Sequence, residues 1–272
     1  MRDSNDFFVG YLSLPTRLSR FYKILIPILF LLGIAVALWL ASGQKSPGKG
    51  IADLSGQQQM TGYLTIDPYP VLHGVWPDQR SVLLVHQTKT AANELVLPYA
   101  NQWVNRSGFA LQRGGWSMLQ LPPNSEITQA PAIAGVDLTL TVLDNLTFEG
   151  EIIDSKCFLG AMKPGGGKVH RACASLCLRG GVPPMLVVKD AQGDRFGYLL
   201  MNEDDSSASV QLSEIVAVPV RVTGQLVQRG DLQYMRLNTN TIERLTGQAL
   251  AAYGETLTGN QFAESTPHLH AH

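Results

Sequence analysis

The chain has 272 residues, of which 45% are hydrophobic and 16% are charged, and its formal net charge at pH 7 is -1. This length and apolar content suit one large or two small folded domains and exclude a fully disordered chain. Because positive and negative charges nearly cancel, neither nucleic acid nor an anionic membrane surface is an implied partner.

An apolar segment follows the first 23 residues. From Ile24 to Gln44 there is no charged residue, and a helix of that length covers about 30 Å, the thickness of a bilayer core. More cationic residues precede the segment than follow it, which favours a cytoplasmic N-terminus. We therefore expect a cytoplasmic segment over 1–23 and a transmembrane helix over 24–44 in a bacterial inner membrane, with periplasmic domains beyond. A cleaved signal peptide is the alternative, although its apolar region is usually shorter.

The remaining chain divides by composition. Gly, Ser, Gln and Lys dominate residues 45–60, which is typical of a flexible linker. Apolar periodicity fades in a C-terminal tail over 248–272. Between these segments we expect two β-barrel domains, over 61–146 and 147–247.

An internal repeat supports two domains. The segment Val104–Gly114 resembles Val220–Gly230 at a constant offset, and each copy ends in Gln-Arg-Gly. Short strands that alternate apolar and polar residues, separated by glycine turns, favour small antiparallel barrels. The predicted fold is mainly β: an N-terminal transmembrane helix followed by two tandem OB-like antiparallel β-barrels. The second barrel carries a short Cys/His-bearing helix, inserted after its first strand.

That insertion holds the residues that are best suited to bind a metal ion or to form a disulfide. Cys157, His170, Cys173 and Cys177 include all 3 cysteines of the chain and one of its 6 histidines. Glycines and prolines bound a predicted helix over 168–178, which would place the histidine and the last two cysteines on one face. With Cys157 at the end of the preceding strand, they would form a Cys₃His set, which binds zinc and would also accept Cu(I).

A disulfide is the competing interpretation, because an exported chain lies in an oxidising compartment. Cys173 and Cys177 are four positions apart on a helix and rarely reach disulfide geometry, so Cys157 would pair with one of them. One thiol would remain, reactive or paired between chains. The sequence leaves open the disulfide, the metal site and the attachment of another cofactor.

Other signals are weaker. The run Gly165-Gly-Gly-Lys168 lacks the glycine and the Ser/Thr of a Walker phosphate loop, because Met162 and Val169 occupy those positions. The sequence contains no recognisable catalytic motif, so whether the chain is an enzyme stays open, and no substrate is indicated.

The cysteine segment resembles a known family. Its motif is Gly150-x-Ile-x-Asp154-x-x-Cys157, then His170-x-x-Cys173-x-x-x-Cys177-x-x-Gly-Gly-x-Pro-Pro and Leu186-Val-Val. It resembles small exported bacterial OB-like β-barrel proteins of unassigned function, over residues 148–245. The resemblance implies an OB-like second barrel and an association with membrane redox enzymes.

Three functions are compatible with these features. The first is a single-pass, membrane-anchored periplasmic accessory or structural subunit of an envelope assembly, such as a respiratory one, with other membrane or periplasmic proteins as partners. The second is a metal-handling or electron-transfer module that uses Cys157, His170, Cys173 and Cys177. The third is a thiol-redox protein, in which the cations Lys168 and Arg171 near the helix start would lower a cysteine pKa.

Overall fold

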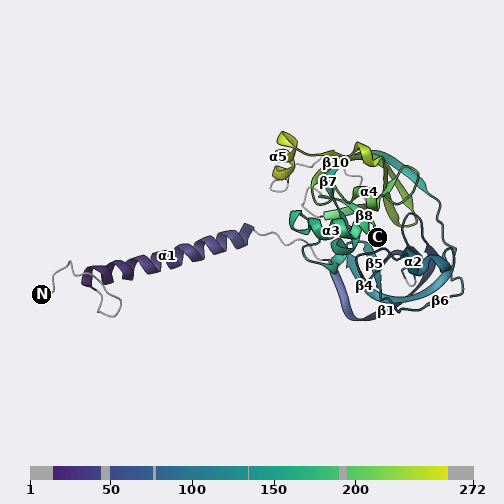
Figure 1. Ribbon diagram of the computed structural model, residues 1–272, viewed down its shortest axis with the longest axis horizontal. Helices are drawn as coiled ribbons and strands as arrows, with labels where there is room; N and C mark the ends of the chain where they lie inside the picture. Colours follow the sequence, from purple (N-terminus) through teal and green to yellow (C-terminus); the bar gives the residue numbers. More distant parts are fainter. Residues whose placement is uncertain (1–14, 44–49, 76–77, 134, 190–194, 257–272) are drawn as a thin grey trace. The chain divides into compact units, whose positions relative to one another are not determined.

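The computed structural model describes residues 15–43, 50–75, 78–133, 135–189 and 195–256. It divides the chain into two units, Met1–Pro47 and Gly48–His272, each shown in Figure 1. In the first unit, helix α1 (Thr16–Gly43) is long and apolar enough over Thr16–Ser42 to cross a membrane, a test that a signal sequence also passes. The helix begins earlier than the expected residue 24, directly after Pro15, so it includes the cationic residues that precede the apolar stretch.

The first β-sheet belongs to the N-terminal half of the second unit. Its strands are β1 (Ile51–Thr65), β2 (Val71–Val75), β3 (Arg80–His86), β4 (Trp103–Arg113), β5 (Trp116–Leu121) and β6 (Ile127–Gln129). They lie in the order β1-β2-β3-β5-β4-β6, and β1 also pairs with β4, so the pairings close a ring. Only β3 and β5 are parallel. Helices α2 (Asn93–Val96) and η1 (Leu97–Tyr99) connect β3 to β4.

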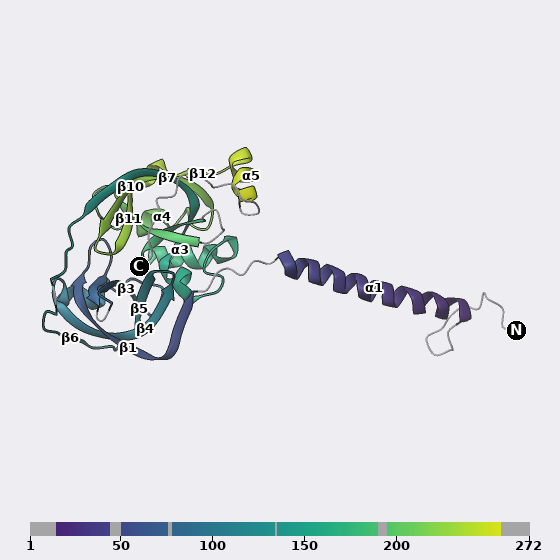
Figure 2. The same ribbon diagram turned by 180° about the vertical axis from the view of Figure 1, so that it is seen from behind.

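The second sheet repeats this arrangement, and Figure 2 shows it from behind. Its strands are β7 (Thr141–Asp154), β8 (Pro184–Lys189), β9 (Arg195–Asn202), β10 (Pro219–Arg229), β11 (Leu232–Leu237) and β12 (Glu243–Arg244). The order is β11-β9-β8-β7-β10-β12, a β10–β11 pairing closes the ring, and β9 and β11 are parallel. Helix α4 (Ser209–Leu212) connects β9 to β10, and η4 (Thr239–Thr241) and α5 (Gly247–Thr256) complete the described chain.

The internal repeat of the sequence therefore has a structural counterpart. Strands β4 and β10 occupy the same place in their sheets, and a glycine recurs in the middle of each. A Cβ atom at Gly108 or at Gly224 would lie less than 3.0 Å from a carbonyl oxygen of the neighbouring strand. Only glycine permits this close approach of two backbones, so the repeated glycines reflect repeated strand packing.

The expected domain boundaries need correction in three places. Strand β1 begins at Ile51, so residues 51–60 of the expected linker are strand and pair with β4; residues 45–49 lie outside the described part. Strand β7 begins at Thr141, inside the range expected for the first domain, and α5 occupies the start of the expected tail. The first ten residues of β1 are largely exposed, so their polar composition resembles that of a linker.

The two halves share one hydrophobic core. Leu83 and Met118 of the first half and Met185 and Leu199 of the second belong to the same buried cluster. Two hydrogen bonds also connect the halves: the Tyr69 hydroxyl donates to the Leu200 carbonyl at 2.5 Å and accepts from the Ala208 amide at 3.1 Å. A site built from both halves can therefore have a fixed geometry.

Candidate metal centre

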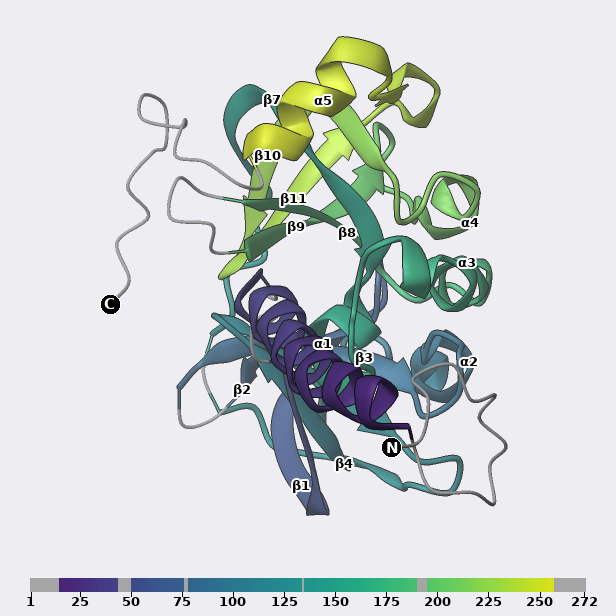
Figure 3. The ribbon, with the colours of Figure 1, turned by 90° about the vertical axis from the view of Figure 1, so that its left-hand side faces the viewer.

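The Cys/His insertion lies between β7 and β8, as the sequence predicts. It contains the helical turn η2 (Cys157–Ala161), the turn η3 (Lys168–His170) and helix α3 (Arg171–Arg179). Figure 3 shows α3 between α2 and α4 along one side of the second unit. The equivalent connection in the first half, between β1 and β2, has no helix, so the chemistry belongs to the second copy of a common scaffold.

Three of the predicted ligands converge. The donor atoms of Cys157, His170 and Cys173 all lie within 4.8 Å of one another, and the Sγ atoms of the two cysteines are 4.0 Å apart. Two thiolates on a tetrahedral zinc ion with Zn–S bonds of about 2.3 Å lie about 3.8 Å apart. The sulfur separation therefore suits metal coordination.

The disulfide that the sequence left open as an alternative is not present. All three cysteines are free, and the 4.0 Å between the Cys157 and Cys173 sulfurs is about twice the S–S bond length of about 2.05 Å. The physical reason is that α3 and η2 present the thiols side by side without bringing the sulfurs into bonding contact.

The fourth predicted ligand, Cys177, joins the cluster through Cys157. Donor atoms of Asp154, Cys157 and Cys177 form a second set within 4.8 Å, and all three residues are buried. Cys157 donates a hydrogen bond to Cys177, which lowers the pKa of Cys177 and raises that of Cys157. The four predicted residues thus meet around Cys157, although in two overlapping sets.

Asp154 is a site residue that the sequence analysis did not single out. Its Oδ2 is 2.9 Å from Nε2 of His170, and its Oδ1 accepts the Cys157 amide at 2.8 Å. Both Asp154 and His170 are buried. A carboxylate that binds one ring nitrogen orients a metal-binding histidine and leaves its other nitrogen available as a ligand. The only sequence signal was the position of Asp154 in the Asp-x-x-Cys motif.

Two lysines provide positive charge at the centre. Nζ of Lys156 donates to the carbonyls of His86, Gln87 and Thr88 at 2.9, 2.8 and 2.5 Å. Lys89, from the same loop of the first half, donates to Sγ of Cys173 at 2.6 Å, and this interaction raises the Lys89 pKa. Lys89 lies far from the cysteines along the chain and in no motif, so no sequence pattern pointed to it.

The loop that carries Lys89 is packed directly on the insertion. The Ala91 amide donates to the Gly180 carbonyl at 2.8 Å, and a Cβ atom at Gly180 would collide with the Lys89 carbonyl. Gly180 follows the last residue of α3, and its lack of a side chain allows the first-half loop to pack against the helix end. The candidate centre is consequently covered by the other half of the body.

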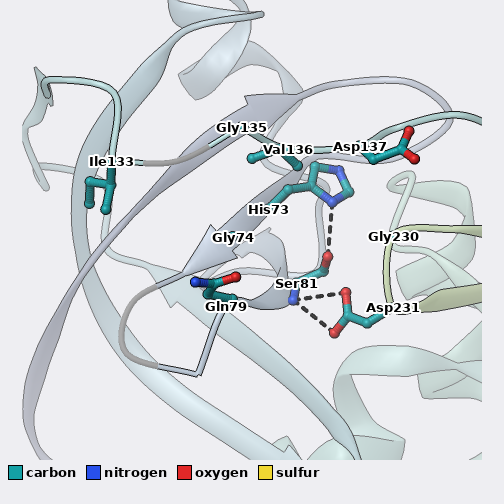
Figure 4. Close-up of a pocket in the computed structure, with 10 residues that line it drawn as sticks. All are labelled: His73, Gly74, Gln79, Ser81, Ile133, Gly135, Val136, Asp137, Gly230 and Asp231. Carbon is teal, nitrogen blue, oxygen red and sulfur yellow. Dashed lines mark hydrogen bonds between the residues drawn. The ribbon is translucent and has the colours of Figure 1, made fainter.

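A separate polar cluster joins the halves away from the cysteines (Figure 4). His73 bridges Ser81 Oγ and Thr65 Oγ1, both at 2.9 Å, and the Ser81 amide donates to both carboxylate oxygens of Asp231 in the β10–β11 hairpin, at 3.0 and 2.9 Å. The cavity beside it has a volume of about 210 Å³. Burial lowers the His73 pKa from 6.5 to about 4, and the positive charge of Arg229 acts in the same direction.

We expect the His73 shift to make stability depend on pH. His73 titrates near 4 in the folded state and near 6.5 when unfolded, so its contribution is complete above about pH 6.5 and declines as the pH falls toward 4, by about 3 kcal/mol in all. Denaturant unfolding at several pH values should show this slope, and His73→Gln should flatten it. An equal slope in both proteins would show that other groups cause it.

Comparison with protein-family models, curated proteins and solved structures finds no match to this chain. Its function must therefore be argued from the chemistry of the site itself.

Proposed function

We propose that this chain is a membrane-anchored protein whose body holds a zinc ion between Cys157, His170, Cys173 and Cys177. The observation that carries the proposal is the 4.0 Å separation of the Cys157 and Cys173 sulfurs within a set that includes a His170 ring nitrogen. Four protein ligands leave no open coordination position, so the zinc would hold the structure together rather than activate water.

Charge balance supports zinc over Cu(I). Three thiolates and the Asp154 carboxylate carry four negative charges, and Lys89 and Lys156 carry two positive ones. A divalent ion brings this set of charges to neutrality, whereas a monovalent ion leaves one uncompensated negative charge. Uncompensated buried charge is costly, and zinc accepts both thiolate and imidazole ligands.

The scaffold in this proposal consists of two OB-type barrels. In each half the pairings close a ring of five strands, the third and fifth strands are parallel, and a helix precedes the fourth. Small Greek-key barrels of this type bind their ligands with loops that include the one after the first strand. The cysteine insertion occupies that loop in the second half.

The cellular setting is also a proposal. The apolar helix α1 supports a retained anchor, and the cationic residues before it support an exported body. The expectation of a periplasmic accessory subunit in an envelope assembly fits a zinc-stabilised scaffold and stays a prediction.

A thiol-redox protein is the second candidate, because one thiol is accessible. Cys173 is half-buried, whereas Cys157 and Cys177 are buried. Lys89 donates a hydrogen bond to its sulfur. Rotation of Cys157 or Cys173 would be needed to close a disulfide across the 4.0 Å gap.

Metal and thiol analysis of one sample tests both candidates. Full-length protein purified in detergent without chelator should contain about one zinc per chain, and its thiols should react with a thiol reagent only after a chelator removes the metal. Metal-free protein with reactive thiols would contradict the zinc proposal. An intact mass about 2 Da lower before reduction would establish a disulfide and favour the redox candidate.

A further inference from the structure

A second candidate site lies in the C-terminal half, in a cleft of about 420 Å³. The cleft is formed by β7, the start of α3 with the turn before it, the ends of β8 and β9 nearest each other, the start of β10, and α5. The lining residues are Glu151, Gly167, Lys168, Arg171, Lys189, Arg195, Ala217, Val218, Pro219 and Tyr253. Four of these side chains are basic and one is acidic, so the lining has an excess of positive charge.

The single acidic residue is already engaged. Oε1 of Glu151 accepts the Gly167 amide, and Oε2 lies 3.8 Å from a terminal nitrogen of Arg195. Glu151 therefore fixes the turn before α3 and one of the four cations. Lys168 and Arg171, which are both exposed, contribute positive charge that Glu151 does not contact.

Several donors at the cleft lack strong acceptors. Nε of Arg195 is buried and has no hydrogen-bond partner within the described structure. Arg171 reaches only the Glu214 carbonyl, at 3.5 Å, and the Lys168 side chain makes no hydrogen bond or ion pair to any described residue. The exposed Lys168 and Arg171 side chains are therefore available to an anionic ligand in the cleft.

The local backbone also favours an anion. The helical segment begins at Lys168 and continues as α3, so its amide groups and positive dipole end lie at the cleft. A Cβ atom at Gly166 would lie 2.9 Å from a terminal nitrogen of Arg195, so the glycine run makes room for this guanidinium. The run is not a Walker loop, but it places a lysine and two arginines around one space.

We propose that this cleft binds a phosphate monoester. A dianion matches the positive excess better than a single carboxylate does, and guanidinium groups bind phosphate oxygens in pairs. The apolar segment 217–219 provides a surface for the organic part of the ligand. The ligand chemistry could come from a soluble metabolite or from a lipid headgroup, and the site does not depend on the zinc proposal.

Calorimetric titration of the full-length protein in detergent tests the site, with glycerol 3-phosphate and dihexanoyl phosphatidic acid as probes. We expect about one site per chain with a dissociation constant below about 1 mM, weakened by added salt. Binding of the lipid at least about tenfold tighter than glycerol 3-phosphate would identify a headgroup site, and similar affinities would identify a soluble monoester.

Paired variants on one helix provide the control. Lys168→Ala/Arg171→Ala should weaken binding at least about tenfold. Arg179→Ala removes another α3 arginine that contacts Glu214 but does not line the cleft, and it should leave affinity unchanged. Unfolding midpoints of both variants would verify folding. The proposal would be overturned if neither probe bound at concentrations up to about 10 mM. It would also be overturned if the Lys168→Ala/Arg171→Ala protein bound the probes as tightly as the Arg179→Ala protein.

Discussion

Replacing Cys157 by serine should abolish zinc binding and lower the free energy of unfolding by at least about 3 kcal/mol. Cys157 has the largest expected effect because it is the one residue common to both donor sets. Serine keeps the size of the side chain but is a poor zinc ligand at neutral pH, so the metal contribution to folding is lost. Elemental analysis and denaturant unfolding of the purified full-length protein measure the two effects.

A neighbouring serine provides the matched control. Ser155 is buried, and its Oγ has no hydrogen-bond partner among the described residues. Ser155→Ala should retain zinc and leave stability unchanged or slightly raised, because a buried hydroxyl without a partner is unfavourable. Wild-type protein stripped of metal should have about the stability of Cys157→Ser. A Cys157→Ser protein that retains zinc would show that the proposed centre is wrong.

The sequence predicted the part of the site that depends on local geometry. His170 and Cys173 lie one turn apart on one helical segment, so their spacing alone placed them together, whereas Cys177 belongs to the second donor set. Cys157 follows the strand that leads into the same insertion, which kept it close. The predictions of a mainly β chain with an N-terminal apolar helix are confirmed, because strand alternation and an uncharged stretch are local signals.

The rest depended on contacts between distant segments. Lys89 reaches Cys173 from the other half of the body, and no spacing rule connects the two positions. Asp154 was visible in the motif, but its role depends on the His170 ring that it contacts. Residues 51–60 have the composition of a linker and become strand because β4 pairs with them. Tertiary pairing overrides local preference in such cases.

Replacing Lys156 by methionine should lower the free energy of unfolding by about 3 kcal/mol. The Lys156 ammonium donates to three carbonyls of one first-half loop, and the loss of each hydrogen bond from a charged donor costs about 1 kcal/mol or more. Methionine preserves the apolar stem, so the loss reports the hydrogen bonds rather than the packing. Denaturant unfolding measures it, with Lys168→Met as the control because Lys168 is exposed.

The same variant should loosen the cover over the zinc site. Without Lys156, the loop that carries Lys89 is held to the insertion by the Ala91–Gly180 backbone hydrogen bond and by the contact of Lys89 with Cys173. Amide hydrogen exchange at residues 87–91 should therefore accelerate, because local opening there becomes easier, and a chelator should remove the zinc faster. If the variant unfolded and exchanged like wild type, the three carbonyls must find other donors, and Lys156 would not join the two halves.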